Sequence, residues 1–153
     1  IVDTPGQIEL FAYRQSGPFF VQNFEAEEKM NLFLFDGTMV STPSNFVSLM
    51  LLSTSIRLRL GLPTVNVITK TDLIEEKLQQ VLSWSGTDSK LEADLAGEVN
   101  GDTFSLVSDM LTSINRNDFQ QDLIPVSNAT GDGMVNLQSA LSRTINLGEE
   151  IED

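Results

Sequence analysis

Short, continuous apolar runs alternate with longer stretches of helical periodicity along this chain. The runs at residues 30–37 and 63–69 are apolar or β-branched and end in polar residues, which predicts parallel strands buried on both faces. A shorter run at residues 122–127 predicts a third strand. Ile1 and Val2 predict the end of a further buried strand at the start of the sequence.

Helical periodicity fills most of the chain between these runs. After a loop near residues 8–16, it predicts helices at about residues 17–24, 41–60, 72–84 and 104–115, and a last one from about residue 135. The alternation predicts an α/β fold, an open and mostly parallel sheet with helices on both faces and a ligand at one rim.

The domain organisation follows from the same pattern. Residues 1–148 predict one domain, with a surface helical insertion at about 85–118 whose acidic side chains we expect to be solvated. We expect Trp84 to anchor this insertion. The acidic residues 149–153 predict a frayed tail.

Charge and hydropathy restrict the partners. The chain carries 9 Lys and Arg against 22 Asp and Glu, a formal net charge of −13. Such a chain would be repelled by a phosphate backbone, so we expect no direct nucleic-acid binding. The apolar runs are all too short to span a bilayer, which predicts a cytoplasmic protein without a membrane partner.

The chain contains no Cys and no His. This composition excludes thiolate nucleophiles, imidazole-dependent triads and ordinary zinc sites. Carboxylate, Gln, Lys and backbone groups remain, a set that suits Mg²⁺-assisted phosphoryl transfer.

The first chemical pattern is the segment IVDTPGQIELF at residues 1–11. Asp3 would follow a strand and hold Mg²⁺ through water, while the backbone N–H of Gly6 could approach a terminal phosphate. Gln7 could then orient the attacking water. An ordinary turn is the alternative, although a proline in the third position of Asp-Thr-Pro-Gly is disfavoured in the commonest turn type.

The second pattern, TKTD at residues 69–72, lies between a predicted strand and a predicted helix. The aliphatic stem of Lys70 could lie along a purine face. The carboxylate of Asp72 could accept both the N1–H and the exocyclic amino group of guanine, a donor pair that adenine lacks. The alternative is that Asp72 caps the following helix together with Glu75.

Two further strand ends carry polar residues. In the loop Ser127-Asn128-Ala129, a backbone N–H could bond the O6 oxygen of guanine, although a Gly-rich turn before a helix is common in itself. Asp36 ends the strand at residues 30–37, and we interpret it as a cap or turn residue rather than a ligand.

The order DxxG, (N/T)KxD and a Ser-containing loop, each after an apolar run, resembles the later motifs of GTPase domains. DTPGQIE, a Ser-Gly-Pro segment and LFLFDG are similar to the GPN-loop GTPases, a family of homodimeric or paired hydrolases in the signal-recognition and MinD-type branch of P-loop proteins. The resemblance covers nearly the whole chain, and DTPGQIE is its most specific part.

The resemblance implies a P-loop NTPase-like domain that uses GTP and Mg²⁺. The chain would be its carboxyl-terminal part, with the amino-terminal strands, the loop G-x-x-x-x-G-K-(S/T) and the Gly-Pro-Asn loop expected upstream of residue 1. The implied site residues come from the three loops: the metal ligand Asp3, the phosphate contact Gly6, the catalytic Gln7, and the guanine-binding Thr69, Lys70, Asp72, Ser127 and Asn128.

The resemblance also implies partners and shows departures. It implies a homodimer that acts as a nucleotide-dependent switch in the assembly of client protein complexes, which in eukaryotic members are RNA polymerase complexes. Thr69 stands where Asn is usual, and Asn128 where a small Ala is common. Without a phosphate-binding loop, we expect the isolated chain to bind GTP negligibly and to be inactive.

Two alternatives remain open. A GTPase of the translation or ribosome-assembly class also uses DTPG, but its usual next residue is His, whereas this chain has Gln7. A truncated paralogue without enzymatic activity could instead keep the sheet as a scaffold and present its acidic surface to a partner.

Overall fold

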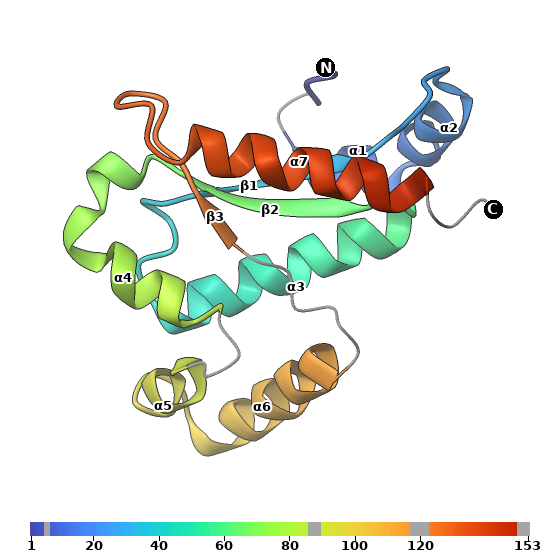
Figure 1. The fold of residues 1–153 in the computed structure, drawn as a ribbon. Helices are drawn as coiled ribbons and strands as arrows, with labels where there is room; N and C mark the ends of the chain where they lie inside the picture. The colour runs from blue at the N-terminus through green and yellow to red at the C-terminus, as the bar shows by residue number, and fades with distance from the viewer. Residues whose placement is uncertain (5–6, 86–89, 117–122, 150–153) are drawn as a thin grey trace.

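The computed structural model describes residues 1–4, 7–85, 90–116 and 123–149, and its centre is a parallel sheet (Figure 1). The strands are β1 (Asn31–Asp36), β2 (Thr64–Thr69) and β3 (Leu123–Pro125), in the order β1-β2-β3. Asp36 pairs with Thr69 at the end of the first two strands, so the carboxyl ends lie side by side at one rim.

The described helices cover both faces of this sheet (Figure 1). They are α1 (Ile8–Tyr13), α2 (Ser16–Asn23), α3 (Pro43–Leu60), α4 (Glu75–Ser83), α5 (Leu91–Ala96), α6 (Gly101–Arg116) and α7 (Met134–Glu149), with a 3₁₀ turn, η1 (Thr71–Leu73), before α4. The predicted α/β architecture is therefore confirmed. No helix in the described part of the chain is long and apolar enough to cross a membrane.

The longest helix, α3, has clear signals at both ends. Thr42 precedes it and its side chain accepts a hydrogen bond from the backbone N–H of Asn45, while Pro43 occupies the first turn. Gly61 ends the helix in the left-handed conformation, at φ 67°. The predicted helix at 41–60 is confirmed nearly to the residue.

Each face of the sheet has its own apolar core. On one face Phe33, Phe35 and Ile68 pack with residues of α3, α4, α5 and α6. On the other face Val65 and Val67 pack with α7, together with side chains of β3. Burial of both faces of β2 explains its continuous apolar and β-branched sequence.

The prediction that β1 is buried on both faces is wrong. Leu32 and Leu34 are 37% and 60% exposed, although Phe33 and Phe35 are buried. The register places Leu32 beside Val65, on the α7 side, and α7 packs over β2 rather than over β1. β1 is thus an edge strand of the described sheet with one uncovered face.

Two predictions for the first residues also differ from the structure. Ile1 and Val2 belong to no strand and are exposed, because no described strand pairs with them. The predicted loop at 8–16 contains α1, which is too short for a periodic signal. Its Ala12 is buried, and the Ala12 carbonyl accepts a 3.2 Å hydrogen bond from Nε of Arg59.

The described residues 90–116 of the predicted insertion contact the rest of the chain through α5. Leu91 and Leu95 of α5 are buried, and α5 packs against α3. Trp84 anchors this region as expected: it packs against Phe46 and donates a 2.8 Å hydrogen bond from its indole N–H to Asp94. Of the tail predicted at 149–153, Glu149 is the last residue of α7, and residues 150–153 lie outside the described residues.

Some of the acidic side chains expected to be solvated hold this region in place. The Glu98 carboxylate accepts hydrogen bonds from the backbone N–H and the hydroxyl of Ser44, both at 2.9 Å. The Ser44 N–H holds the pKa of Glu98 below its ordinary value, and the Trp84 indole does the same for the pKa of Asp94. These two carboxylates therefore have a structural role at the first turn of α3 and beside Trp84.

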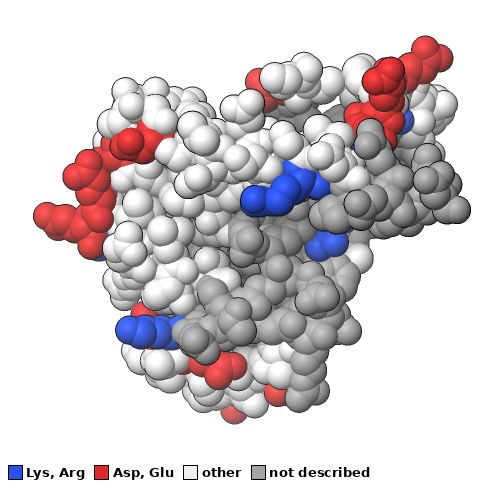
Figure 2. All heavy atoms as spheres, in the orientation of Figure 1, with Lys and Arg blue, Asp and Glu red and all other residues white. Residues whose placement is uncertain are grey.

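The remaining charge is unevenly spread. Figure 2 shows acidic side chains gathered over α4 and around α2 on this face, with few Lys and Arg side chains between them. Together with the net charge of −13, this distribution opposes contact with a nucleic-acid backbone.

Candidate functional site

Three strand ends meet at one rim of the sheet and are tied together there (Figure 1). The Thr69 hydroxyl donates a 3.1 Å hydrogen bond to the Phe35 carbonyl, which ties the end of β2 to β1. The backbone N–H of Thr71 donates to the Val126 carbonyl at 3.3 Å. The loop after β2 is thus attached to both neighbouring strands.

Lys70 is the first residue beyond β2 and has an unusual backbone. Its φ of 56° and ψ of 37° place it in the left-handed region, where no other non-glycine residue in the described part of the chain lies. Such a conformation costs about 1–2 kcal/mol in an L-residue, and single residues of this kind cluster at functional sites. The loop is therefore held in one strained shape by its surroundings.

The side chain of Lys70 reaches across to the end of β1. Its ammonium lies 2.6 Å from Oδ2 of Asp36. The other carboxylate oxygen of Asp36 accepts from the backbone N–H and the hydroxyl of Thr38, at 3.0 and 2.7 Å. Lys70 foremost, and Thr38 after it, hold the pKa of Asp36 below its ordinary value.

Asp72 connects the second strand end to the third. Its Oδ1 accepts a 2.6 Å hydrogen bond from the buried hydroxyl of Ser127. No side chain caps η1 or α4, so the alternative role of Asp72 as a helix cap is wrong. The Asp72 side chain bonds instead to Ser127, which lies 55 residues away in the sequence on the loop after β3.

The loop after β3 is closed on itself. Ser127 donates its N–H to the Asp132 carbonyl, and its own carbonyl accepts from Gly131. Gly133 has φ 79°, and a Cβ there would lie 1.8 Å from the Pro125 carbonyl oxygen, so only glycine fits. The loop therefore presents Asn128 and Ala129 at a fixed, exposed position.

Some polar groups at this rim remain free to bind a ligand. Within the described residues, Oδ2 of Asp72 accepts no hydrogen bond, and the backbone N–H groups of Asn128 and Ala129 donate none. The rim thus offers one carboxylate oxygen as an acceptor and two N–H donors, on loops that the Ser127 hydroxyl holds together.

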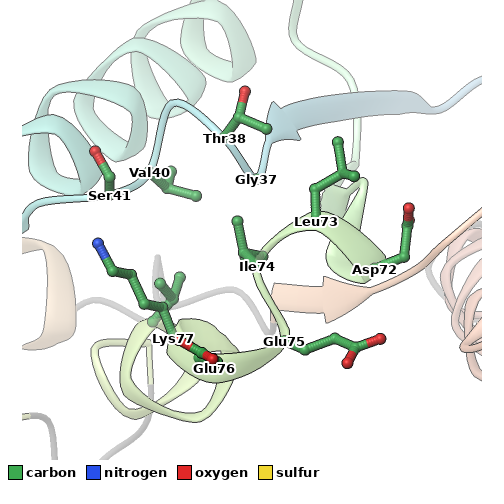
Figure 3. A pocket seen from close by; sticks show the side chains of 11 residues that line it. Gly37, Thr38, Val40, Ser41, Asp72, Leu73, Ile74, Glu75, Glu76 and Lys77 are labelled. Carbon is green, nitrogen blue, oxygen red and sulfur yellow. The ribbon is translucent and has the colours of Figure 1, made fainter.

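A cavity of about 480 Å³ lies between the loop after β1 and the start of α4, and Asp72 is one of its lining residues (Figure 3). Ile74 points into it, opposite Thr38, while the carboxylate of Asp72 lies at its edge. Neither Lys70 nor Ser127 lines this cavity. We place the candidate site at the rim rather than in the cavity, because the free donors and acceptors lie at the rim.

The structure does not bring the first residues to this rim. Asp3 and Gln7 are exposed, Gln7 precedes α1, and the amino-terminal segment lies apart from the strand-end loops (Figure 1). Gly6 lies outside the described residues. The predicted roles of these three residues at the metal and the terminal phosphate remain predictions.

The residues present fit a magnesium ion only in part. No group of three or more His, Cys, Asp or Glu side chains that could hold a metal was found among the described residues. Mg²⁺ bound together with a nucleotide needs only one or two carboxylates, since phosphates and water supply the rest. Asp3, as a single exposed carboxylate, suits that role.

The family of the chain follows from comparison with known proteins. Residues 1–147 match the model of a family described as "Conserved hypothetical ATP binding protein". The chain is 28% identical over 155 residues to GPN-loop GTPase 1 of Saccharomyces cerevisiae, covering 95% of this chain and 40% of that protein. It is 30% identical over 137 residues to GPN-loop GTPase QQT2 of Arabidopsis thaliana, covering 88% and 35%.

The fold has a solved counterpart as well. A crystal structure from Pyrococcus abyssi, described as a GTPase in its apo form, matches with a TM-score of 0.75 and 22% identity, over 93% of this chain and 56% of that one. The chain spans about 40% or less of the length of these two curated relatives. The family match over residues 1–147, with these relatives, shows that the chain belongs to the family described as conserved hypothetical ATP binding proteins and, within it, to the GPN-loop GTPases.

Proposed function

We propose that this chain carries the guanine-binding loops of a GTPase that binds and hydrolyses GTP with Mg²⁺. The observation that carries the proposal is the 2.6 Å bond from Ser127 to Asp72, which leaves the second oxygen of the Asp72 carboxylate open at the rim. The family description names ATP, whereas the curated relatives are named GTPases. The chemistry of Asp72 favours guanine.

A carboxylate distinguishes the two purines by their hydrogen-bonding edges. Guanine offers two donors, N1–H and the exocyclic amino group, and the open side of Asp72 can accept from them. Adenine has an acceptor at N1, which would face the carboxylate without a proton between them. A site built for hydrogen bonds rejects a ligand that leaves its polar groups unpaired.

The neighbouring loops complete this assignment. The stem of Lys70 would lie along the base, and an N–H of Asn128 or Ala129 would donate to its O6 oxygen. Thr69 would keep the loop in place through its bond to the Phe35 carbonyl. Ser127 would orient Asp72 rather than contact the base through its hydroxyl.

The hydrolytic part of the proposal rests on the first loop. Asp3 would hold the metal ion through water, Gly6 would approach the γ-phosphate, and Gln7 would orient the attacking water. Mg²⁺ would neutralise charge on the phosphates. We further propose a homodimer that switches between GTP and GDP states as client protein complexes assemble, as the sequence resemblance to the GPN-loop GTPases implies.

A change of base preference tests the proposal in the complete product of the gene. Asp72→Asn replaces the acceptor with an amide that can donate to the C2 carbonyl of xanthine. The variant should lose about a hundredfold or more in kcat/KM for GTP and gain hydrolysis of XTP. Asp102→Asn, an exposed acid at the start of α6, is the matched control for the lost charge.

The outcomes separate the candidate functions. Hydrolysis of GTP by the wild type and of XTP by the variant supports the guanine site. Hydrolysis of ATP in preference to GTP by the wild type would contradict it. No nucleotide binding or hydrolysis in either form would favour the scaffold.

A further inference from the structure

Asp36 has a more specific place at the rim than a turn residue requires. Its Oδ1 is held by the N–H and the hydroxyl of Thr38, at 3.0 and 2.7 Å. This local arrangement fixes the carboxylate plane within its own loop, independently of β2. Its Oδ2 is then left to bind a group from a neighbouring element, and that group is the ammonium of Lys70, at 2.6 Å.

Lys70 is in turn presented to Asp36 by its backbone. Thr69, just before it, bonds to the Phe35 carbonyl, and Thr71, just after it, bonds to the Val126 carbonyl. With both neighbours tied, Lys70 takes the left-handed conformation, and its side chain extends toward the end of β1. Both ends of the Lys70 side chain are thus fixed, the Cα by the loop and the ammonium by Asp36.

The contribution of this ion pair to folding is a poor explanation for it. The side chains of Lys70 and Asp36 are 54% and 30% exposed, and ion pairs open to solvent contribute little to stability. The same exposure leaves the methylene stem of Lys70 accessible between its two fixed ends. A stem held in this way gives up little rotamer freedom when a flat ligand covers it.

We propose that Asp36 is a positioning residue for guanine recognition, which holds the ammonium of Lys70 so that the Lys70 stem is a ready wall for the base. This inference rests on the guanine site proposed above. Asp36 acts through Lys70 and has no contact of its own with the base. Its loss should therefore matter only while Lys70 has an ammonium to hold.

A double-mutant cycle in the complete product of the gene tests this dependence. GDP affinity is measured by calorimetry for the wild type, Asp36→Asn, Lys70→Met and the double variant. Methionine keeps an unbranched apolar stem and removes the ammonium. Asp36→Asn should weaken GDP binding about three- to tenfold beside Lys70 and less than about twofold beside methionine, because a freed stem must be ordered on binding.

Two further variants separate positioning from folding. Asp102→Asn removes an exposed acid elsewhere and should leave the affinity unchanged. Thr38→Val removes the hydroxyl that holds Asp36, while keeping the side-chain volume and the ion pair's own atoms, and should weaken GDP binding in the same direction but less. If Asp36→Asn lowers the melting temperature so far that binding cannot be compared, Thr38→Val decides the question.

The results distinguish this inference from the proposed function. Equal costs of Asp36→Asn with Lys70 and with methionine, or no cost in either, would overturn the positioning role while leaving the guanine site intact. An unchanged affinity in Thr38→Val, where that variant has to decide, would overturn it too. A wild type that binds no GDP would remove the proposed function and this inference together.

Discussion

The bond between Ser127 and Asp72 allows a quantitative prediction. Ser127→Ala removes the hydroxyl that donates to Asp72 at 2.6 Å and accepts from the Thr130 N–H at 3.2 Å. Hydrogen bonds to charged groups contribute about 1.5–3 kcal/mol net. Because Asp72 is only half-buried, water can replace part of this bond, so we expect a loss of about 1–2 kcal/mol in the free energy of unfolding.

The same substitution should weaken nucleotide binding. Without Ser127, the carboxylate of Asp72 must be ordered when the base arrives, at a cost of about 0.5–1.5 kcal/mol, or about two- to tenfold in GDP affinity. Urea denaturation measures the first effect and calorimetric titration with GDP the second. Both use the complete product of the gene.

A matched control separates this effect from the loss of any serine. Ser139→Ala removes a hydroxyl on an exposed position of α7 that donates to the Val135 carbonyl at 2.9 Å. It should change the unfolding free energy by less than about 0.5 kcal/mol and leave GDP affinity unaltered. If Ser127→Ala behaves like this control in both assays, the bond to Asp72 does not organise the site.

Two predictions concern stability. Gly133→Ala should lower the free energy of unfolding by about 2 kcal/mol or more, since φ is 79° and the added Cβ would lie 1.8 Å from the Pro125 carbonyl oxygen. Gly101→Ala is the control, because a Cβ added there has nothing within 4 Å. Equal denaturation midpoints for the two variants would refute this prediction. The pKa of Glu98 is lowered in the fold by the Ser44 N–H, so its stabilisation is present above its ordinary value of 4.5 and is lost as pH falls through the lower folded value. Glu98→Gln should therefore remove part of the acid-induced loss of stability, followed by fluorescence of the single tryptophan, and an acid profile identical to that of the wild type would contradict the assignment.

The strands and the main helix could be predicted because their signals are local. A continuous apolar run stopped by Asp-Gly marks β1, and Thr42, Pro43 and Gly61 mark the ends of α3. What covers a strand is not local. The exposure of Leu34 depends on where α7 packs, and no property of the run itself reports that position.

The candidate site also combines local and non-local features. TKTD predicts Lys70 and Asp72 as guanine-binding residues, but the local sequence also offered Asp72 a role as a helix cap, and only the fold excludes that cap. The partner of Lys70 is Asp36, 34 residues away, and this pairing requires the register of β1 against β2. A polar residue at the end of each parallel strand was the one signal that could have indicated it.

The side-chain contacts around α5 could not be predicted from the sequence for a related reason. Acids in a Ser- and Gly-rich stretch predict solvated side chains, yet Asp94 and Glu98 bind Trp84 and the first turn of α3. An exposed helix end and a buried indole both need partners that a sequence does not locate.

The central claim is that the loops after β2 and β3 hold guanine, and a crystal structure of the complete product of the gene with GDP tests it most directly. The account predicts the carboxylate of Asp72 at hydrogen-bonding distance, about 2.7–3.2 Å, from N1 and the exocyclic amino group, with the stem of Lys70 along the base. A base bound elsewhere, for example in the cavity between Thr38 and Ile74, would contradict it.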